Sequence, residues 1–82
     1  MYKKINGLCI DEKPIQDSEP PENFDDRNCR ERCEANVYCT GFDVYKAGET
    51  CRTWKSYRIT GNGHTEYECY VKTGTCFITN YL

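Results

Sequence analysis

The sequence predicts a small α+β domain in which a single helix packs on a curved antiparallel sheet and disulfide bonds supply much of the stability. The chain has only 82 residues, and 7 of them are cysteine, a density close to that of disulfide scaffolds. Its mean hydropathy is −0.85, so apolar burial alone gives a chain of this size little stability. One helical segment is followed by runs with strand alternation, separated by turn residues.

Composition also limits where the protein can reside and which molecules it can bind. Lysine and arginine total 11 against 13 acidic residues, a net charge of −2, which argues against a nucleic-acid binder. Cysteine used on this scale indicates a secreted protein. The segment 1–5 lacks the apolar core of a signal peptide, so we interpret the chain as a mature secreted protein or a domain excised from one. No run approaches the roughly 20 apolar residues of a membrane span.

The first third of the chain contains one short predicted strand and an acidic stretch. Residues 7–10 form the strand, which carries Cys9. Three prolines at positions 14, 20 and 21 exclude a helix or a central strand from the stretch that follows. Its carboxylates could bind calcium, but the spacing of a calcium loop is absent and a solvated loop is the favoured interpretation. They are Asp11, Glu12, Asp17, Glu19, Glu22 and Asp25.

A helix is predicted over residues 27–34. Asp25 or Asp26 can cap its free N–H groups, and both suit the positive end of the helix dipole. Asn36, which tolerates a left-handed conformation, is expected to end it. Phe24 precedes the cap and can fold back on the first turn.

The cysteines decide which face of this helix is buried. Cys29 and Cys33 stand four residues apart, so they share one face, which we expect to point inward. The outward face carries Arg27, Glu31 and Glu34. Arg30 and Arg32 could mark a binding site, although an ordinary solvated helix surface is the favoured interpretation.

Strands and turns fill the rest of the chain. Residues 41–45 and 50–54 flank a turn-length linker, and residues 57–60 and 64–67 flank Gly-Asn-Gly. The linker with its glycine predicts a hairpin for the first pair. Asn-Gly between strand-like runs is a strong hairpin signal and predicts one for the second pair. The last strand continues over 68–72, with Cys69 and Val71 on one face and Tyr70 and Lys72 on the other. Residues 75–79 could add a further short strand.

These residues resemble the PAN/apple family. The resemblance runs from Cys9 to Lys72. It rests on Cys29-x3-Cys33-x5-Cys39-Thr-Gly-Phe, on Cys51 after a hairpin, and on Cys69-Tyr-Val-Lys in the last strand. It implies one helix cradled by a curved antiparallel sheet, in a single domain over 1–82 with a core of about 7–72 and a C-terminal extension over 73–82.

The resemblance also implies a disulfide set, which cysteine counting alone does not choose. The bridges it implies are Cys29–Cys51, Cys33–Cys39 and Cys9–Cys69. Cys76 is then left over. It could link two chains, remain a free thiol, or pair within the chain by displacing Cys69. The apolar residues of the tail would be difficult for a monomer to hide; they are Phe77, Ile78, Tyr81 and Leu82.

Enzymatic and metal-binding functions find little support. The only histidine, His64, lies beside a predicted turn, and no nucleophile, base and orienting group can be assembled around it. Structural zinc sites use two close cysteine pairs, whereas only Cys29 and Cys33 have that spacing. We therefore expect no enzyme activity, no metal and no cofactor.

Binding is the remaining function. Aromatic and cationic residues gather on the predicted hairpins and could stack on sugar rings or hold anionic groups. The set is Arg52, Trp54, Lys55, Tyr57, Arg58 and His64, with Trp54 as a core residue the competing interpretation. Several PAN-containing proteins bind carbohydrate or protein, so the resemblance implies a secreted interaction module for a glycan or an extracellular protein. The alternative is a structural subunit that forms a disulfide-linked dimer or filament through Cys76 and its tail. A small inhibitor or toxin is a third option.

Overall fold

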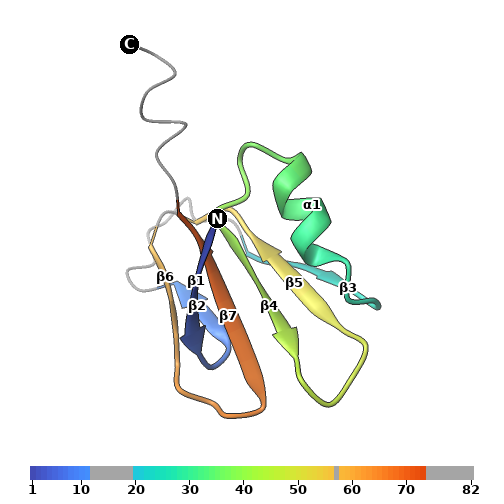
Figure 1. Cartoon of the computed structure of the whole chain (residues 1–82), viewed down its shortest axis with the longest axis vertical. Helices are drawn as coiled ribbons and strands as arrows, with labels where there is room; N and C mark the ends of the chain where they lie inside the picture. The colour runs from blue at the N-terminus through green and yellow to red at the C-terminus, as the bar shows by residue number, and fades with distance from the viewer. Residues whose placement is uncertain (12–19, 57, 74–82) are drawn as a thin grey trace.

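The computed structural model describes residues 1–11, 20–56 and 58–73, which form one helix and a set of short strands. The elements in chain order are β1 (Tyr2–Asn6), β2 (Cys9–Asp11), β3 (Glu22–Phe24), α1 (Cys29–Ala35), β4 (Gly41–Tyr45), β5 (Cys51–Trp54), β6 (Ile59–Gly61) and β7 (Tyr67–Lys72). Figure 1 shows them as a sheet with α1 beside it. The predicted α+β class, one helix with antiparallel strands and disulfides, is confirmed.

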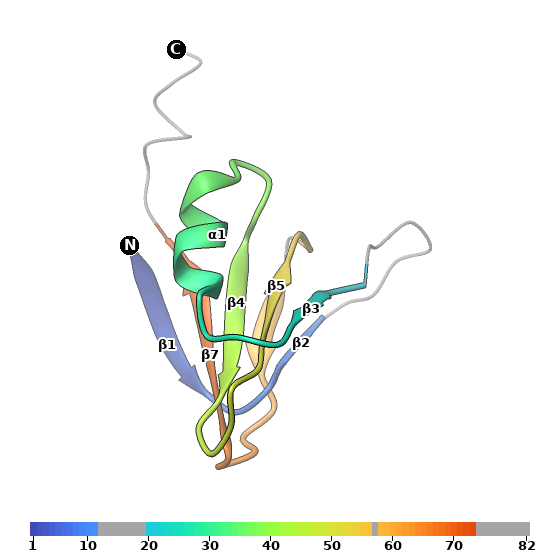
Figure 2. The same ribbon diagram turned by 90° about the vertical axis from the view of Figure 1, so that its right-hand side faces the viewer.

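The strands form two antiparallel sheets. The larger has the order β1-β7-β4-β5-β3, and β2 pairs with β6 in the smaller. The predicted hairpin between residues 41–45 and 50–54 is confirmed, since β4 pairs with β5 and places Asp43 opposite Arg52. On its other side β4 pairs with β7, which places Asp43 opposite Cys69. Figure 2 shows α1 running alongside these strands.

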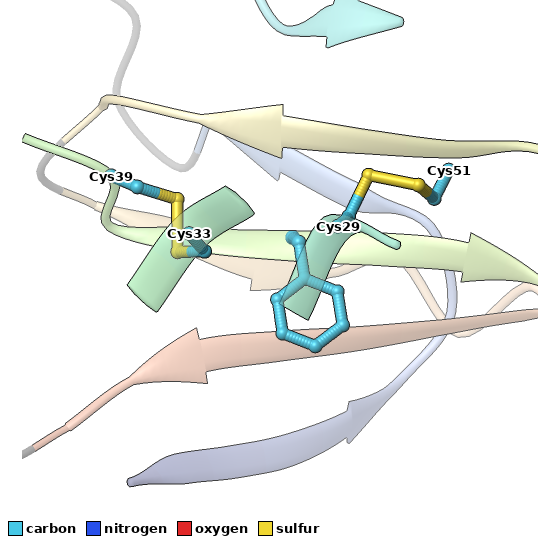
Figure 3. Packing of buried hydrophobic residues seen from close by; sticks show 5 residues of the cluster. Cys29, Cys33, Cys39 and Cys51 are labelled. Atoms are coloured by element: carbon cyan, nitrogen blue, oxygen red, sulfur yellow. A yellow bond between two sulfur atoms is a disulfide. The ribbon is translucent and has the colours of Figure 1, made fainter. Parts of the chain in front are cut away.

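Cysteines dominate the core between α1 and the sheet. Cys29 bonds to Cys51 and so joins α1 to β5, while Cys33 bonds to Cys39 and closes the loop from α1 to β4. Figure 3 shows these two bridges side by side over the sheet. All four sulfurs are buried together with Phe42. Each bridge is worth roughly 2–4 kcal/mol by constraining the unfolded chain, so a helix of 7 residues does not need to rely on apolar packing alone.

A second core lies on the opposite face of the sheet. Cys9 bonds to Cys69 across a sequence separation of 60, which joins β2 to β7. Trp54 and Ile59 pack with this bridge. The predicted alternation of the last strand is confirmed, because Cys69 and Val71 belong to this core and Tyr70 packs on the helix side.

The helix begins later than predicted, and neither end closes as predicted. Asn28 precedes α1 and makes no side-chain cap hydrogen bond. The carboxylate of Asp26 accepts the Asn28 N–H at 2.9 Å and pairs with both terminal nitrogens of Arg32, an arrangement that replaces capping. Asn36 is extended at φ −119° instead of left-handed, and its N–H donates to Cys33 O at 3.3 Å. The Cys33–Cys39 bridge holds the chain at this point, so no left-handed turn is needed.

The hairpin predicted across Asn-Gly is wrong. β6 pairs with β2, and the segment after it turns back toward residues 6–8. Asn62 donates its N–H to Leu8 O at 3.0 Å and accepts the Leu8 N–H at its side-chain oxygen at 2.9 Å. Gly63 has a φ of 84° and donates to Asn6 O at 3.0 Å. These long-range bonds satisfy the backbone groups that a local hairpin would have paired, so tertiary pairing overrides the turn signal.

Two edge strands were not predicted. β1 pairs with β7 along residues 2–6, which precede the predicted start of the core, and β3 pairs with β5.

The predicted strand 75–79, the tail and Cys76 lie outside the described residues, as does the stretch 12–19. Because Cys69 is bonded to Cys9, Cys76 does not displace Cys69. The other two alternatives for Cys76 stay predictions.

Candidate ligand-binding site

The candidate site is built around a buried carboxylate on the sheet face opposite α1. Because β4 alternates, Phe42 packs toward the helix and Asp43 toward the other face. Asp43 is only 1% exposed. It accepts the backbone N–H of Cys9 at 3.1 Å and the indole N–H of Trp54 at 3.1 Å. These donors compensate the cost of burying a charge.

Arg52 completes the network from the neighbouring strand. Its Nε donates to Asp43 Oδ1 at 3.0 Å and its Nη2 to Asp43 Oδ2 at 2.7 Å. Nη2 also donates to Cys9 O at 3.0 Å, which ties β5 to β2. The guanidinium lies 5.1 Å from the ring centroid of Trp54, a cation–π distance. The side chain is 23% exposed, so Arg52 is fixed in place while part of it reaches the surface.

A hollow of about 370 Å³ opens beside this network. Its volume lies at the lower end of the range of small-ligand sites, roughly 300–1,000 Å³. The lining combines side chains able to donate or accept hydrogen bonds with two aromatic rings. The lining residues are Leu8, Asn23, Phe24, Asp25, Asp43, Thr50, Cys51, Arg52 and Tyr67.

Tyr67, one of the two aromatic residues that line the hollow, packs against two further rings. The ring of Tyr67 lies 5.0 Å from that of Tyr45 and 5.2 Å from that of His64, the latter edge to face. Tyr45 and Tyr67 are half-buried and His64 is exposed. Half-buried aromatic rings beside polar groups can stack on the apolar face of a sugar.

The structure describes five of the six residues predicted to bind a ligand, and these five do not share one surface. Arg52 lines the hollow, and His64 contacts Tyr67, which also lines it. Trp54 is 7% exposed and belongs to the core. Lys55 is exposed just after β5 and Arg58 is exposed just before β6, and Tyr57 lies outside the described residues.

Sequence reasoning missed Asn23, Thr50 and Tyr67. Asn23 reaches the hollow because β3 pairs with β5, which places it opposite Arg52. No local pattern predicted that pairing. The pairing of Asp43 with Arg52 could have been found, since the predicted hairpin places these opposite charges across from each other.

The arginines of α1 contact aromatic rings on the other face. Arg30 is exposed and its guanidinium carbon lies 4.9 Å from the ring centroid of Tyr2 and 5.4 Å from that of Tyr70. Burial raises the pKa of Tyr2, and burial together with a hydrogen bond to Glu68 raises the pKa of Tyr70. Arg32 is held by its pair with Asp26, so it stabilises the entry to the helix.

In residues 1–11, 20–56 and 58–73, no three side chains of the histidine, cysteine, aspartate or glutamate type come together as a metal site. The six cysteines of this part of the chain are all in disulfide bonds.

No helix in the described part of the chain has the length and apolar character to cross a bilayer. Several disulfides in so short a chain are typical of extracellular proteins.

Comparison of the chain with protein-family models, with characterised proteins and with solved structures gave no match in any of the three. The resemblance to the PAN/apple family therefore stays a prediction from the cysteine pattern.

Proposed function

We propose that this chain is a secreted, non-catalytic interaction module and that the hollow beside Arg52 is its binding site. The observation that carries the proposal is the combination in one hollow of an immobilised guanidinium, uncharged hydrogen-bonding side chains and two aromatic side chains. Immobilised groups lose little entropy when a ligand binds, which favours affinity.

The charges of the site favour a neutral glycan over an anionic ligand. The guanidinium of Arg52 is neutralised by Asp43 at 2.7 Å, and Asp25 adds a negative charge to the lining. An anion would therefore meet no net positive charge. Sugar hydroxyls can donate to Asp25 and can exchange hydrogen bonds with Asn23 and Thr50, while a sugar face stacks on Tyr67.

A glycan array tests this proposal with variants that spare the buried network. Asn23 and Thr50 are exposed, so Asn23→Ala and Thr50→Ala should leave the fold intact. Losing one or two hydrogen bonds of roughly 1 kcal/mol each predicts affinities lower by about tenfold. The matched control is Arg58→Ala, at an exposed position just before β6 and outside the lining of the hollow, which should bind like the wild type.

Binding that depends on Arg58 and not on the hollow residues would show that the ligand does not bind in the hollow. If Arg58→Ala abolishes binding and the hollow variants do not change it, the ligand occupies the surface predicted from sequence. If only extracellular proteins bind, and the hollow variants weaken them, the module recognises protein through the same residues. Absence of both kinds of binding would refute the function.

The structural-subunit alternative depends on Cys76 and the apolar tail, which lie outside the described residues. A separate observation, the exposed edge of β1, favours it.

A further inference from the structure

β1 has one backbone edge facing away from the sheet. It is the terminal strand of the larger sheet, and its inner edge pairs with β7. At one end of this ladder Thr73 donates to Met1 O at 2.8 Å, and at the other Gly7 donates to Tyr67 O at 3.0 Å. Hydrogen-bonded positions alternate in an antiparallel pair, so the odd-numbered positions from 1 to 7 pair with β7. The backbone groups that face outward are those of Tyr2, Lys4 and Asn6.

Part of this outer edge has no partner among the described residues. Asn6 O accepts the N–H of Gly63 at 3.0 Å, which covers the C-terminal end of the strand. The outward N–H and C=O groups of Tyr2 and Lys4 pair with nothing in the described part of the chain. An unpaired edge of this kind is a template for another strand.

The usual protection against edge pairing is reduced here, because β1 carries two exposed lysines, Lys3 and Lys4, and one of them is neutralised. Lysines on an edge strand normally repel an incoming strand, but the ammonium of Lys4 pairs with Glu68 at 3.0 Å and its charge is balanced. The opposite edge of the sheet, β3, is only 3 residues long and follows two prolines, which makes it a poor template. β1 is therefore the edge of the sheet best able to accept a strand.

The sequence after β7 has the composition of a strand that could fill this edge. Residues 74–82 carry no Asp, Glu, Lys or Arg, and 75–79 read Thr-Cys-Phe-Ile-Thr, residue types enriched in strands. Thr73, the residue that precedes this segment, lies next to Met1, because the Thr73 N–H bonds to Met1 O. Figures 1 and 2 both show the start of β1 at the end of the molecule where β7 finishes. Nine residues span up to roughly 30 Å, and a five-residue strand needs about 17 Å.

Topology favours pairing with a second copy over pairing within the chain. To reach the outer edge of its own β1, the segment would have to cross the Met1 end of that strand, a distance of two strand spacings or roughly 9.6 Å. It would then run parallel to β1, through a connection that skips a neighbouring strand, which is uncommon. The segment of a second copy has neither restriction and can add antiparallel to β1.

We propose that residues 75–79 of one copy add as an antiparallel strand to the outer edge of β1 in a second copy. Reciprocal exchange between two copies closes a two-fold dimer, and exchange without closure continues into a filament. The surface used is the edge formed by Tyr2 and Lys4, so this assembly is independent of the hollow beside Arg52.

Sedimentation equilibrium of a Cys76→Ser chain tests the proposal without a covalent link between copies. This chain should sediment at twice the 9.6 kDa of a single chain, or more if it forms filaments. Lys4→Pro removes an outward N–H that pairs with no described residue, a change that edge strands tolerate, and should give monomers with an unchanged far-UV circular dichroism spectrum. The matched control, Lys4→Ala, keeps that N–H and should still assemble. Deletion of residues 74–82 should also give monomers.

Hydrogen exchange of the Lys4 amide in the Cys76→Ser chain provides a readout that does not depend on a variant of β1. We expect its protection to increase about tenfold or more as the protein concentration is raised from mostly monomer to mostly assembled. A monomer at every concentration overturns the proposal, as does assembly that survives both Lys4→Pro and the tail deletion. Protection that is independent of concentration would mean that the chain covers its own edge, and would also overturn it.

Discussion

Replacing Asp43 by asparagine is the most informative single change in the protein. The carboxylate is 1% exposed and accepts hydrogen bonds from the Cys9 backbone, the Trp54 indole and the Arg52 guanidinium. All of these partners are donors, so the NH₂ of an asparagine would face another N–H at one of the two oxygen positions. The guanidinium of Arg52 would also lose the negative charge that balances it.

The magnitude follows from the burial of this pair. Removing one partner of a buried ion pair costs roughly 3–5 kcal/mol, and the 23% exposure of the Arg52 side chain places the cost at the lower end, about 3 kcal/mol. For a domain of this size 1 kcal/mol corresponds to roughly 4–8 °C in Tm. Asp43→Asn should therefore melt roughly 12–24 °C below the wild type when all disulfides are kept oxidised, as measured by thermal unfolding followed by near-UV circular dichroism.

Asp25→Asn is the matched control, because it makes the same chemical change at an exposed residue of the same hollow. Its free energy of unfolding should stay within about 0.5 kcal/mol of the wild type. An Asp43→Asn variant within about 1 kcal/mol of the wild type would refute the network as a source of stability.

Three further predictions concern the rest of the fold. The Tyr2 hydroxyl is buried without a hydrogen-bond partner among the described residues, so Tyr2→Phe should leave the free energy of unfolding unchanged or higher. Tyr70→Phe loses a 2.6 Å hydrogen bond and should lower the free energy of unfolding by about 1 kcal/mol. A larger loss of stability in Tyr2→Phe than in Tyr70→Phe would contradict these roles of the two hydroxyls. Hydrogen bonds from Arg32 and from the backbone lower the pKa of Asp26 to about 2 from 3.8. A carboxyl pKa lowered by folding stabilises the protein above the unfolded pKa and stops doing so as pH falls from about 4 to 2. In an NMR titration Arg32→Gln should bring the pKa of Asp26 back toward its ordinary value, and an unchanged pKa would show that Arg32 is not the cause. A Cβ at Gly61 would collide with a backbone oxygen of β1, so Gly61→Ala should lower the Tm by several degrees, and an unchanged Tm would place the β1–β6 contact in doubt.

The cysteine pattern carried most of what could be predicted about the fold. The spacing of Cys29 and Cys33 identified the buried face of α1, and both cysteines are fully buried in the structure. The resemblance supplied three pairings, and all three are present. Strand-like runs between turn residues predicted β4, β5 and β7, although the structure buries residues on both faces of these strands.

What the sequence did not predict depends on long-range pairing. β1 reads Tyr-Lys-Lys-Ile-Asn, with little alternation of its own, and forms because β7 provides a ladder for it. The Asn62-Gly63 turn was misread because the local signal contains no information about the backbone of residues 6–8, which binds it. The candidate site could not be predicted for the same reason, since Asn23 and Arg52 meet only through the register of β3 with β5.

We conclude that three specific disulfides hold the helix and the second strand on the sheet and so create the surface around the hollow. Mass spectrometry of a non-reducing proteolytic digest tests it most directly. We expect linked peptides for Cys9–Cys69, Cys29–Cys51 and Cys33–Cys39, and none that joins Cys76 to another cysteine of the same chain. Free thiols at these six positions, or a bridge from Cys76 to Cys9 within one chain, would contradict the account.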